Sequence, residues 1–425
     1  MKGYQELSRE ELLSLHEELL KEYDAWKEKG LSLNMARGKP SSAQLDLTND
    51  FMTVLGHDDY YSEDGTDLRN YGILDGICEA KKLMGDVMDA KPSQTIVFSN
   101  SSLKIMFDTV SRAYTFGILG STPWCKLDKV KFLCPVPGYD RHFGITAQFG
   151  IEMIPIPMDE NGPDMDLVEE YVNNDEAVKG IWCVPKYSNP TGIVYSEETV
   201  KRFAALKPAA KDFRIYWDNA YALHHLYPDI DVDIPNILEE CEKAGNPDMV
   251  YQFASTSKIT FPGAGIAAMS ASEANIEEVK YRLSWQTIGY DKINQMRHVR
   301  FLKDAQGIAE HMRAHAAVIR PKFELVCRKL SEGLEGAGIG AWTNPRGGYF
   351  VSFDAPEGTA KRIVALAKEA GVTMTGAGAT WPYKKDPDDS NIRIAPTLPP
   401  LEELDTAMDV FVCCVKLAAI EKMLA

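Results

Sequence analysis

The sequence lacks the features that would place the chain in a membrane or on a nucleic acid. No stretch reaches the ~18 consecutive apolar residues that a membrane-spanning helix needs. The net charge is −16, from 46 basic and 62 acidic residues, and no dense run of Lys and Arg offsets it. Such a balance disfavours binding to nucleic acid and to anionic membrane surfaces. Internal repeats and low-complexity tracts are also absent.

Disulfide frameworks and metal-binding patterns are missing as well. The eight cysteines form no CxxC pair and show no disulfide-like spacing, which favours buried free thiols in a reducing compartment. His311 and His315 stand four apart in a predicted helix, but no third ligand accompanies them, so we expect no metal. Charged residues such as Glu6 and Arg9 argue against a signal peptide. We therefore expect a cytoplasmic protein.

The length and the pattern of apolar residues predict two domains, one of them α/β. A chain of 425 residues with 45% hydrophobic and 25% charged residues fits two globular domains. Between about 94 and 270, short apolar runs alternate with helical patterns, which is typical of a mostly parallel sheet. The expected strands are Thr95–Phe98, Lys131–Cys134, Glu152–Ile156, Gly180–Val184, Arg214–Trp217 and Met249–Phe253.

Longer helical patterns follow after about residue 275. We expect helices over Ala274–Ile288 and Lys292–Leu334, with Pro321 breaking or kinking the second. A short strand at Asn391–Ala395 precedes a final helix from about residue 400, and residues 5–29 read as an amphipathic helix. These segments predict a smaller α+β domain of residues 1–49 and 301–425, beside a large domain of residues 50–300.

Polar residues gather where the predicted strands end. In an open α/β sheet, ligands bind at the carboxyl ends of the strands. The segments that fall there are Ser99–Ser102, Pro135–His142, Pro185–Gly192, Asp218–Tyr221 and Ser255–Lys258. We expect the functional site among them.

Lys258 and Asp218 are the residues whose chemistry is most specific. A lysine amine that is partly desolvated beside a carbonyl can deprotonate and form an imine, whereas a lone lysine after a strand is usually a surface residue. Asp218 ends the apolar run Phe213–Trp217, where a carboxylate needs a cationic or protonated partner. A protonated pyridine nitrogen is one such partner, and a helix N-cap is the alternative.

Further candidates could contact a ring, a phosphate and a carboxylate. Asn189 and Tyr221 can donate hydrogen bonds to a phenolate oxygen, although Asn189 also stands in a good turn sequence. Ser99–Ser102 can bind a phosphate through helix amides and hydroxyls, or simply cap the helix. Tyr139 can stack on a flat ring or belong to the core. Arg393, in an apolar strand, needs an anion, which is either a substrate carboxylate or a structural partner.

In this order along the chain, these positions resemble the class I aminotransferases, which are fold-type-I enzymes dependent on pyridoxal phosphate (PLP). Within that class the chain resembles the bacterial aspartate aminotransferase subgroup 1c, from Asn34–Pro40 through to Ile392–Ile394. The resemblance implies a mostly parallel seven-stranded sheet in the large domain and a smaller α+β domain. It also implies a homodimer with sites at its interface, and ping-pong transfer of an amino group from aspartate to 2-oxoglutarate.

The resemblance also implies a role for each matching position. Lys258 would form the Schiff base with the cofactor and move the substrate proton. Asp218, supported by His142, would pair with the pyridine nitrogen. The remaining roles implied are Asn189 and Tyr221 at the ring phenolate, Tyr139 stacked on the ring, Ser101, Ser102 and Ser255 at the phosphate, Tyr71 at the phosphate of the partner subunit's site, Arg393 at the substrate α-carboxylate, and Gly38 with Asn189 lining the substrate pocket.

One position departs from the family pattern. Many members carry a phosphate-binding arginine eight residues after the lysine, and here that position is Ile266. More hydroxyl groups, or a lysine such as Lys104, are the alternatives for neutralising the phosphate. The residue for the distal carboxylate of a dicarboxylic substrate also stays open among Arg37, Lys39, Lys104 and Arg141.

Other functions on the same fold compete with this interpretation. An aromatic or alanine aminotransferase and an aspartate β-decarboxylase would use the same lysine chemistry. A non-catalytic ligand-sensing module, like the aminotransferase-like half of some transcription regulators, would need a basic DNA-binding segment. This acidic chain has no spare segment of that kind, which disfavours the last alternative.

Overall fold

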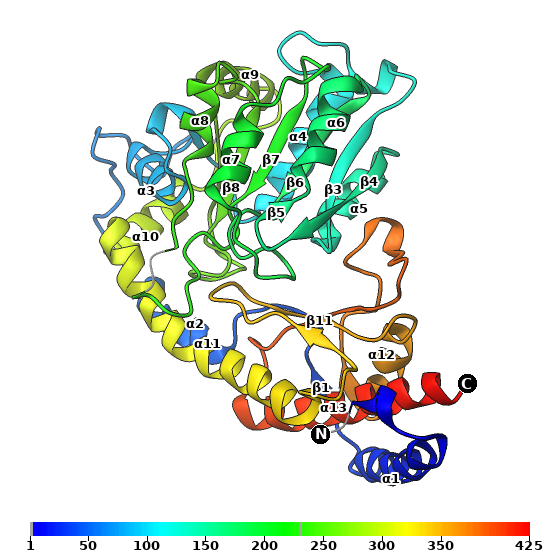
Figure 1. Cartoon of the computed structure of the whole chain (residues 1–425). Helices are drawn as coiled ribbons and strands as arrows, with labels where there is room; N and C mark the ends of the chain where they lie inside the picture. The colour runs from blue at the N-terminus through cyan, green and yellow to red at the C-terminus, as the bar shows by residue number, and fades with distance from the viewer. Residues whose placement is uncertain (1–2, 230–231) are drawn as a thin grey trace.

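The computed structural model describes residues 3–229 and 232–425. In these residues a large sheet flanked by helices forms the upper part of the molecule, and helices with short sheets form the lower part (Figure 1). The first and last described segments of the chain both lie in the lower part. No helix in the described ranges is both long enough and apolar enough to span a membrane. The predicted α/β class is confirmed.

The large sheet contains eight strands in the described residues, in the order β2-β9-β8-β7-β6-β3-β4-β5. Their bounds are β2 Thr95–Val97, β3 Lys131–Val136, β4 Glu152–Asp159, β5 Gly162–Pro163, β6 Val178–Cys183, β7 Arg214–Asp218, β8 Val250–Ser255 and β9 Ala267–Ala271. Neighbouring strands from β8 through β4 pair in parallel, while β9 is antiparallel to both β2 and β8. The count exceeds the expected seven because the two-residue β5 folds back on β4.

All six strands expected from the apolar runs are present, with shifted ends, but β9 was not among them. Its sequence, Ala-Ala-Met-Ser-Ala, contains no β-branched or aromatic residue, so its local strand preference is weak. Pairing with both neighbours forces this segment into a strand, and all five of its residues are buried. Such small side chains leave room for the helices that cover this end of the sheet.

The helices surround the large sheet and build the lower part. Their bounds are α1 Arg9–Glu28, α2 Ser42–Asp46, α3 Cys78–Met88, α4 Ser102–Phe116, α5 Asp140–Gln148, α6 Met165–Asn174, α7 Glu197–Ala204, α8 Ile237–Lys243, α9 Glu273–Leu283, α10 Lys292–Leu302, α11 Ala305–Leu334, α12 Ala360–Glu369 and α13 Leu401–Leu424. The short strands of the lower part are β1 Leu33–Asn34, β10 Ala341–Trp342, β11 Val351–Asp354, β12 Val372–Thr373 and β13 Asn391–Ile394. All eight cysteines are free thiols, as predicted, and five of them are buried.

The long helix expected over Lys292–Leu334 is interrupted, but not at Pro321. It stops at Leu302, Lys303 takes φ = 65°, and Asp304 starts α11 by accepting a hydrogen bond from the Gly307 N–H at 2.9 Å. Pro321 instead lies inside α11, which runs on without a break. The aspartate cap, which the apolar pattern does not register, supplies the start that defines two helices.

α11 connects the two parts of the molecule. Ile308 and Met312, near its start, pack in the apolar cluster beneath the large sheet, whereas Ile319 and later residues pack in the core of the lower part. Figure 1 shows the helix running from the upper part into the lower. The division of the chain at 49/50 and 300/301 stays a prediction.

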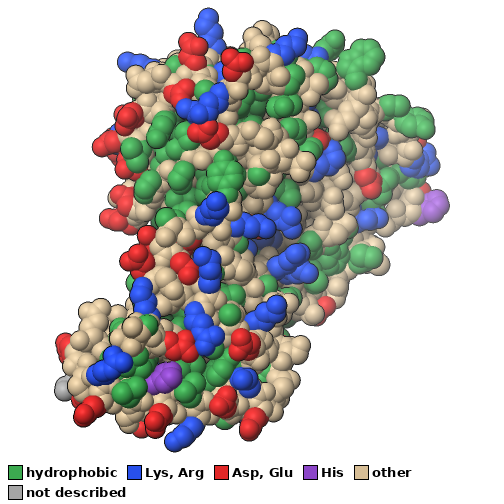
Figure 2. Space-filling model, turned by 90° about the vertical axis from the view of Figure 1, so that its right-hand side faces the viewer, with side chains coloured by type: hydrophobic (Ala, Val, Ile, Leu, Met, Phe, Trp, Pro, Cys, Tyr) green, Lys and Arg blue, Asp and Glu red, His purple; other side chains and the backbone are tan. Residues whose placement is uncertain are grey.

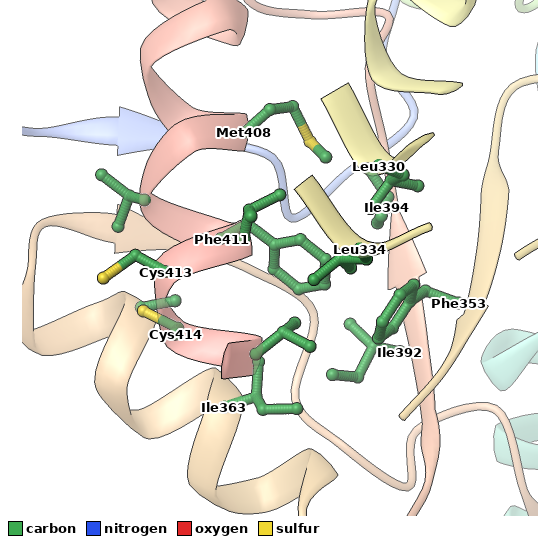
Figure 3. Close-up of a cluster of buried hydrophobic side chains, with 14 of the residues drawn as sticks. Leu330, Leu334, Phe353, Ile363, Ile392, Ile394, Met408, Phe411, Cys413 and Cys414 are labelled. Carbon is green, nitrogen blue, oxygen red and sulfur yellow. The ribbon is translucent and has the colours of Figure 1, made fainter. Parts of the chain in front are cut away.

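The core of the lower part joins the two ends of the chain. One buried cluster contains Leu12, Leu19 and Tyr23 of α1 together with residues of α11, α12, α13 and the short strands. Figure 3 shows Phe411 of α13 among Leu334, Phe353 and Ile363, and its ring lies 5.2 Å from that of Phe353, edge to face. The edge-to-face geometry is a favourable arrangement for two aromatic rings.

Ile363 offers a clean test of this core because it is fully buried. Replacement of Ile363 by alanine leaves a cavity and is expected to lower the free energy of unfolding by about 2–5 kcal/mol. The milder Ile363→Val change should cost about 0.5–1.5 kcal/mol. Urea unfolding followed by circular dichroism measures both, and equal midpoints for the two variants would contradict the packing described.

Candidate functional site

A cavity of about 230 Å³ lies at the carboxyl ends of the central strands. It is closed by the ends of β7 and β8, by the start of α4 and by the turn before α5. Eight of the predicted site residues line it: Ser101, Ser102, Tyr139, Asn189, Asp218, Tyr221, Ser255 and Lys258. Residues from five separate segments therefore meet where the strand order predicted a ligand.

Lys258 projects into this cavity from the turn that follows β8. Its Nζ lies 4.9 Å from the centroid of the Tyr221 ring and 5.7 Å from that of Tyr349. Burial lowers the pKa of the Lys258 ammonium, and the carboxylate of Asp218 partly opposes that shift. A lysine whose pKa is lowered in this way presents more of the neutral, nucleophilic amine near neutral pH.

Asp218 is the last residue of β7 and is only 2% exposed. Its Oδ2 lies 3.0 Å from Nε2 of His142, while its Oδ1 is buried and has no hydrogen-bond partner among the described residues. No helix begins after Asp218, which removes the N-cap alternative. A buried carboxylate oxygen without a donor is costly, so this atom is suited to a protonated nitrogen of a ligand.

His142 is fixed behind Asp218 by its own neighbours. The Trp182 ring stacks on the imidazole with centroids 4.5 Å apart and planes 13° apart. The Trp182 indole N–H donates to Thr146 Oγ1 at 2.8 Å, and the Thr146 hydroxyl donates to the His142 carbonyl at 2.9 Å. The support for Asp218 that the sequence predicted at His142 is therefore present, and Trp182 and Thr146 extend it.

Arg393 approaches the cavity from the lower part of the molecule. Its Nη1 lies 3.0 Å from Oδ1 of Asp140 and 3.2 Å from Oδ1 of Asn189, and its Nε is buried without a partner in the described residues. The salt bridge that the sequence left as an alternative thus exists, but it does not use every donor. A guanidinium carries five N–H groups, so Arg393 retains capacity for a ligand carboxylate.

Gly38 lies close to the aromatic residues that flank this arginine. A Cβ atom at position 38 would come within 2.6 Å of the Phe350 ring and 3.3 Å of the Tyr349 ring. The Phe350 ring in turn lies 4.8 Å from Cζ of Arg393. A side chain at position 38 would displace the Phe350 ring, so glycine suits this approach, and the part of Gly38 in the substrate pocket stays a prediction.

The opposite end of the cavity offers hydroxyl groups and a helix N-terminus. Ser101 caps α4 by accepting from the Lys104 N–H at 3.3 Å, and Ser102 is the first residue of that helix. Ser255 donates to Ser257 Oγ at 3.2 Å, and Ser257 donates to the Asn100 carbonyl at 3.2 Å. Free amides at a helix start together with hydroxyls are a suitable site for an anion such as phosphate.

Tyr139 forms the wall next to Asp218. Its ring meets that of His142 edge to face at 4.9 Å. Burial, reinforced by Asp218 and Asp140, raises the pKa of Tyr139 to about 12, and the positive charges of Arg393 and Arg141 oppose that shift. The phenol is therefore neutral at physiological pH and can lie against a flat ring.

Three positions discussed from the sequence lie elsewhere. Lys104 is exposed and bonds to Asp108 one turn along α4. Ile266 is fully buried in an apolar cluster, where its N–H donates to Thr256 Oγ1 at 3.0 Å. Tyr71 is 83% exposed and does not line the cavity of its own chain.

Sequence reasoning missed Ser257 and Tyr349. Ser257 lines the cavity directly before Lys258, and its hydroxyl type could have marked it. Tyr349 packs on Tyr221 with ring planes 27° apart. The signal for Tyr349 was weaker: it follows two glycines, and Gly347 and Gly348 both lie against Tyr187 too closely for a Cβ atom.

Comparison with known proteins identifies similar chains over almost the whole length. The family profile described as aspartate amino-transferase matches residues 7–425. An aspartate aminotransferase of Corynebacterium glutamicum is 46% identical over 418 residues, covering 98% of this chain and 96% of that protein. The crystal structure of an aspartate transaminase from the same organism superposes with a TM-score of 0.96, covering 99% of each chain.

A more distant structure shares the fold. The α-aminoadipate aminotransferase of Thermus thermophilus, complexed with N-(5'-phosphopyridoxyl)-L-leucine, matches with a TM-score of 0.74 at 18% identity. The alignment covers 95% of each chain. At this identity the likeness shows the fold alone.

The lowered pKa of Lys258 predicts how the cofactor-free protein responds to pH. Lys258→Met should raise the free energy of unfolding near neutral pH, because methionine has no ammonium to desolvate. The lysine has a pKa of about 10.4 in the unfolded chain and a lower pKa in the folded protein. Below the folded pKa both states are protonated, so the lysine lowers the free energy of unfolding by its full amount there. The advantage of the variant should shrink as the pH rises toward about 10.4. Urea unfolding across this range, with the exposed Lys39→Met as control, measures it, and a pH-independent difference would contradict the shift.

Proposed function

Because the chain belongs to the aspartate amino-transferase family, we propose that it is a PLP-dependent aminotransferase that moves the amino group of aspartate to 2-oxoglutarate. One observation carries the proposal. A buried oxygen of Asp218 and a buried nitrogen of Arg393 both lack partners in the described residues, and both belong to the shell around the Lys258 cavity. The Asp218 oxygen can accept from a protonated nitrogen, such as that of the cofactor ring. The Arg393 nitrogen can donate to a carboxylate, such as that of the amino acid.

The residues present suit PLP on each side of the ring. Asp218 would hold the protonated pyridine nitrogen, Asn189 and Tyr221 would donate to the phenolate oxygen, and Tyr139 would cover a face of the ring. The phosphate would bind at the start of α4, to Ser101 and Ser102, and to Ser255 with Ser257. With Ile266 in the apolar core, the helix amides and hydroxyls replace the arginine of other members. When bound, PLP supplies an electron sink for charge at the substrate Cα.

The chain's own groups would do the positioning and the proton transfer. Arg393 would bind the substrate α-carboxylate, with Asn189 and Asp140 holding the guanidinium in place. Burial keeps part of the Lys258 amine neutral. This amine would take the proton from the substrate Cα and then donate it to the cofactor. The aromatic residues Tyr349 and Phe350 would limit the access of water to this exchange.

Aspartate rather than another amino donor follows from the relatives. The protein of C. glutamicum that matches over 98% of this chain is an aspartate aminotransferase. Figure 2 shows Lys and Arg side chains gathered where the upper and lower parts meet, although the whole chain has a charge of −16. A local positive field of this kind suits dicarboxylate substrates.

We also propose a cytoplasmic homodimer with shared sites. Tyr71 stands on the surface with 83% of its area exposed, far more than an aromatic residue usually shows. Trp285 and Ile288 are exposed as well, at 81% and 63%. In a dimer, Tyr71 would reach the phosphate of the partner subunit's site.

Titration of the purified protein with aspartate tests the activity. The visible absorption of the bound cofactor should bleach on adding aspartate and return with 2-oxoglutarate, while oxaloacetate and glutamate accumulate. Lys258→Ala should lose about 100- to 10,000-fold in turnover, because the proton-transferring amine is gone. The exposed Lys21→Ala, in α1, is the matched control.

Three outcomes would overturn the proposal. Near-normal transamination by the Lys258→Ala variant would remove the lysine from the reaction. Pyruvate and carbon dioxide without glutamate would instead identify a β-decarboxylase on the same fold. A faster reaction with alanine or an aromatic amino acid than with aspartate would reassign the donor.

Among the residues open for the distal carboxylate, we propose Arg141. Lys104 is bonded to Asp108, and Arg37 and Lys39 are exposed in the loop around Gly38. Arg141 is exposed too, but it is close enough to Tyr139, a wall of the cavity, for its positive charge to oppose the rise in the pKa of that phenol.

Arg141→Gln should therefore lower kcat/KM for aspartate by roughly 10- to 100-fold, the effect of losing a hydrogen bond to a charged group. Alanine has no distal carboxylate, so its kcat/KM should change little. Steady-state kinetics with both donors measures the ratio, with Arg37→Gln as the matched comparison. Equal losses for aspartate and alanine would remove Arg141 from this role.

A further inference from the structure

Four buried or partly buried histidines converge on the short segment Thr256–Thr260, which carries Lys258. They come from three elements: His224 from the turn after β7, His298 from α10, and His311 and His315 from α11. The cavity described above does not include any of these imidazoles among its lining residues. Each of them has at least one ring nitrogen within hydrogen-bond distance of this segment.

His298 holds the two ends of the segment. Its Nε2 lies 3.0 Å from Thr256 Oγ1 and 3.0 Å from Thr260 Oγ1. Its Nδ1 lies 2.8 Å from the Asn294 carbonyl, which can only accept, so the proton is on Nδ1 and the one lone pair of Nε2 can accept from a threonine hydroxyl. The imidazole thus ties the turn at the end of β8 to α10.

His311 and His315 hold the middle of the segment. Their Nε2 atoms lie 2.7 Å and 3.0 Å from the carbonyl oxygen of Ile259, the residue directly after Lys258. Since a carbonyl only accepts, a bond to it requires the proton on Nε2, and the Nε2 atoms of His311 and His315 also lie 3.1 Å from each other. His224 adds a longer contact, with its Nε2 3.4 Å from the carbonyl of Lys258 itself.

Gln44 selects the proton position on His315. The Ser41 N–H donates to Gln44 Oε1 at 3.1 Å, which orients the amide. Gln44 Nε2 then donates to Tyr349 OH at 2.8 Å and lies 3.3 Å from His315 Nδ1. An unprotonated Nδ1 fits this donor, which leaves the proton on Nε2 for Ile259. Gln44 is fully buried, so water does not compete for these bonds.

We propose that His224, His298, His311 and His315 are positioning residues that act together through Thr256, Ile259 and Thr260 to fix where the Lys258 amine stands in the cavity. The proposal rests on the proposed function in treating that amine as the reacting group. A turn that follows a strand is ordinarily free to shift, and an amine displaced by about 1 Å loses about two orders of magnitude in rate. Buried hydrogen bonds to neutral imidazoles supply the rigidity without placing another positive charge beside the lysine.

His315→Leu tests the proposal in the cofactor-free protein. It removes the bond to Ile259, so backbone amides in the peptide covering residues 256–260 should exchange with deuterium about five- to tenfold faster. His315→Gln is the conservative variant, because its amide can donate to Ile259 and accept from Gln44, and it should restore slow exchange. The pKa of the Lys258 amine, read from the pH dependence of its chemical modification, should rise toward its ordinary value in the leucine variant only.

Ile319→Ala separates positioning from general stability. Ile319 lies one turn further along α11, is 1% exposed and packs in the lower core, a different apolar cluster from that of Ile259. It should lower the melting temperature while leaving both the exchange of residues 256–260 and the Lys258 pKa unchanged. If His315→Leu does not fold, Thr260→Val decides, since it removes one hydroxyl from His298 and should raise exchange about two- to threefold.

Several outcomes would overturn the proposal. Unchanged exchange in His315→Leu, or in Thr260→Val where the former cannot be made, would show that the histidines do not order the segment. An equal increase in Ile319→Ala would reduce their part to general stability. These readouts use the protein without cofactor or substrate, so a failure here differs from a failure to transaminate aspartate.

Discussion

Burial of the Asp218 carboxylate at the end of β7 is the constraint on which the rest of the site depends. A carboxylate that is 2% exposed has lost most of its hydration, which is unfavourable in free energy. Within the described residues, only one of its oxygens has a hydrogen-bond partner, which is His142. Trp182 and Thr146 hold that histidine in place through ring stacking and hydrogen bonds. The second oxygen is left for a ligand, so the cavity requires a ligand that donates a hydrogen bond at this point.

The other side of the cavity is also ordered by contacts within the protein. Arg393 is held by Asp140 and Asn189, so its guanidinium is oriented before any substrate arrives. Asn189 connects the cavity with Arg393, because it lines the cavity and its side-chain oxygen accepts a hydrogen bond from the arginine. A bound amino acid would thus meet groups that are already in place, which lowers the ordering cost of binding.

Charged residues beside apolar strands were easier to recognise in the sequence than elements that are fixed by distant contacts. Lys258, Asp218 and Arg393 could be found because a charged residue beside an apolar strand requires a partner. β9 could not, since Ala267–Ala271 has no local strand preference and is fixed by its neighbours. The break at Lys303 was missed because an aspartate cap defines it, while the visible signal, Pro321, is tolerated inside α11. The contacts of Tyr349 and of the histidines behind Lys258 could not be predicted locally, because their partners lie tens or hundreds of residues away.

α11 explains why a site in the upper part depends on residues of the lower part. Its first turns, which include His311, pack beneath the large sheet, its later turns pack in the lower core, and His315 lies between these two regions. Gln44 and Tyr349, which belong to segments of the lower part, bond to each other beside His315. A shift of the lower part would therefore move the loop around Gly38, the Arg393 strand and the support of the lysine segment together. The placing of the reacting amine and the shape of the substrate pocket are then set by one connected group of contacts, rather than by two parts that adjust independently.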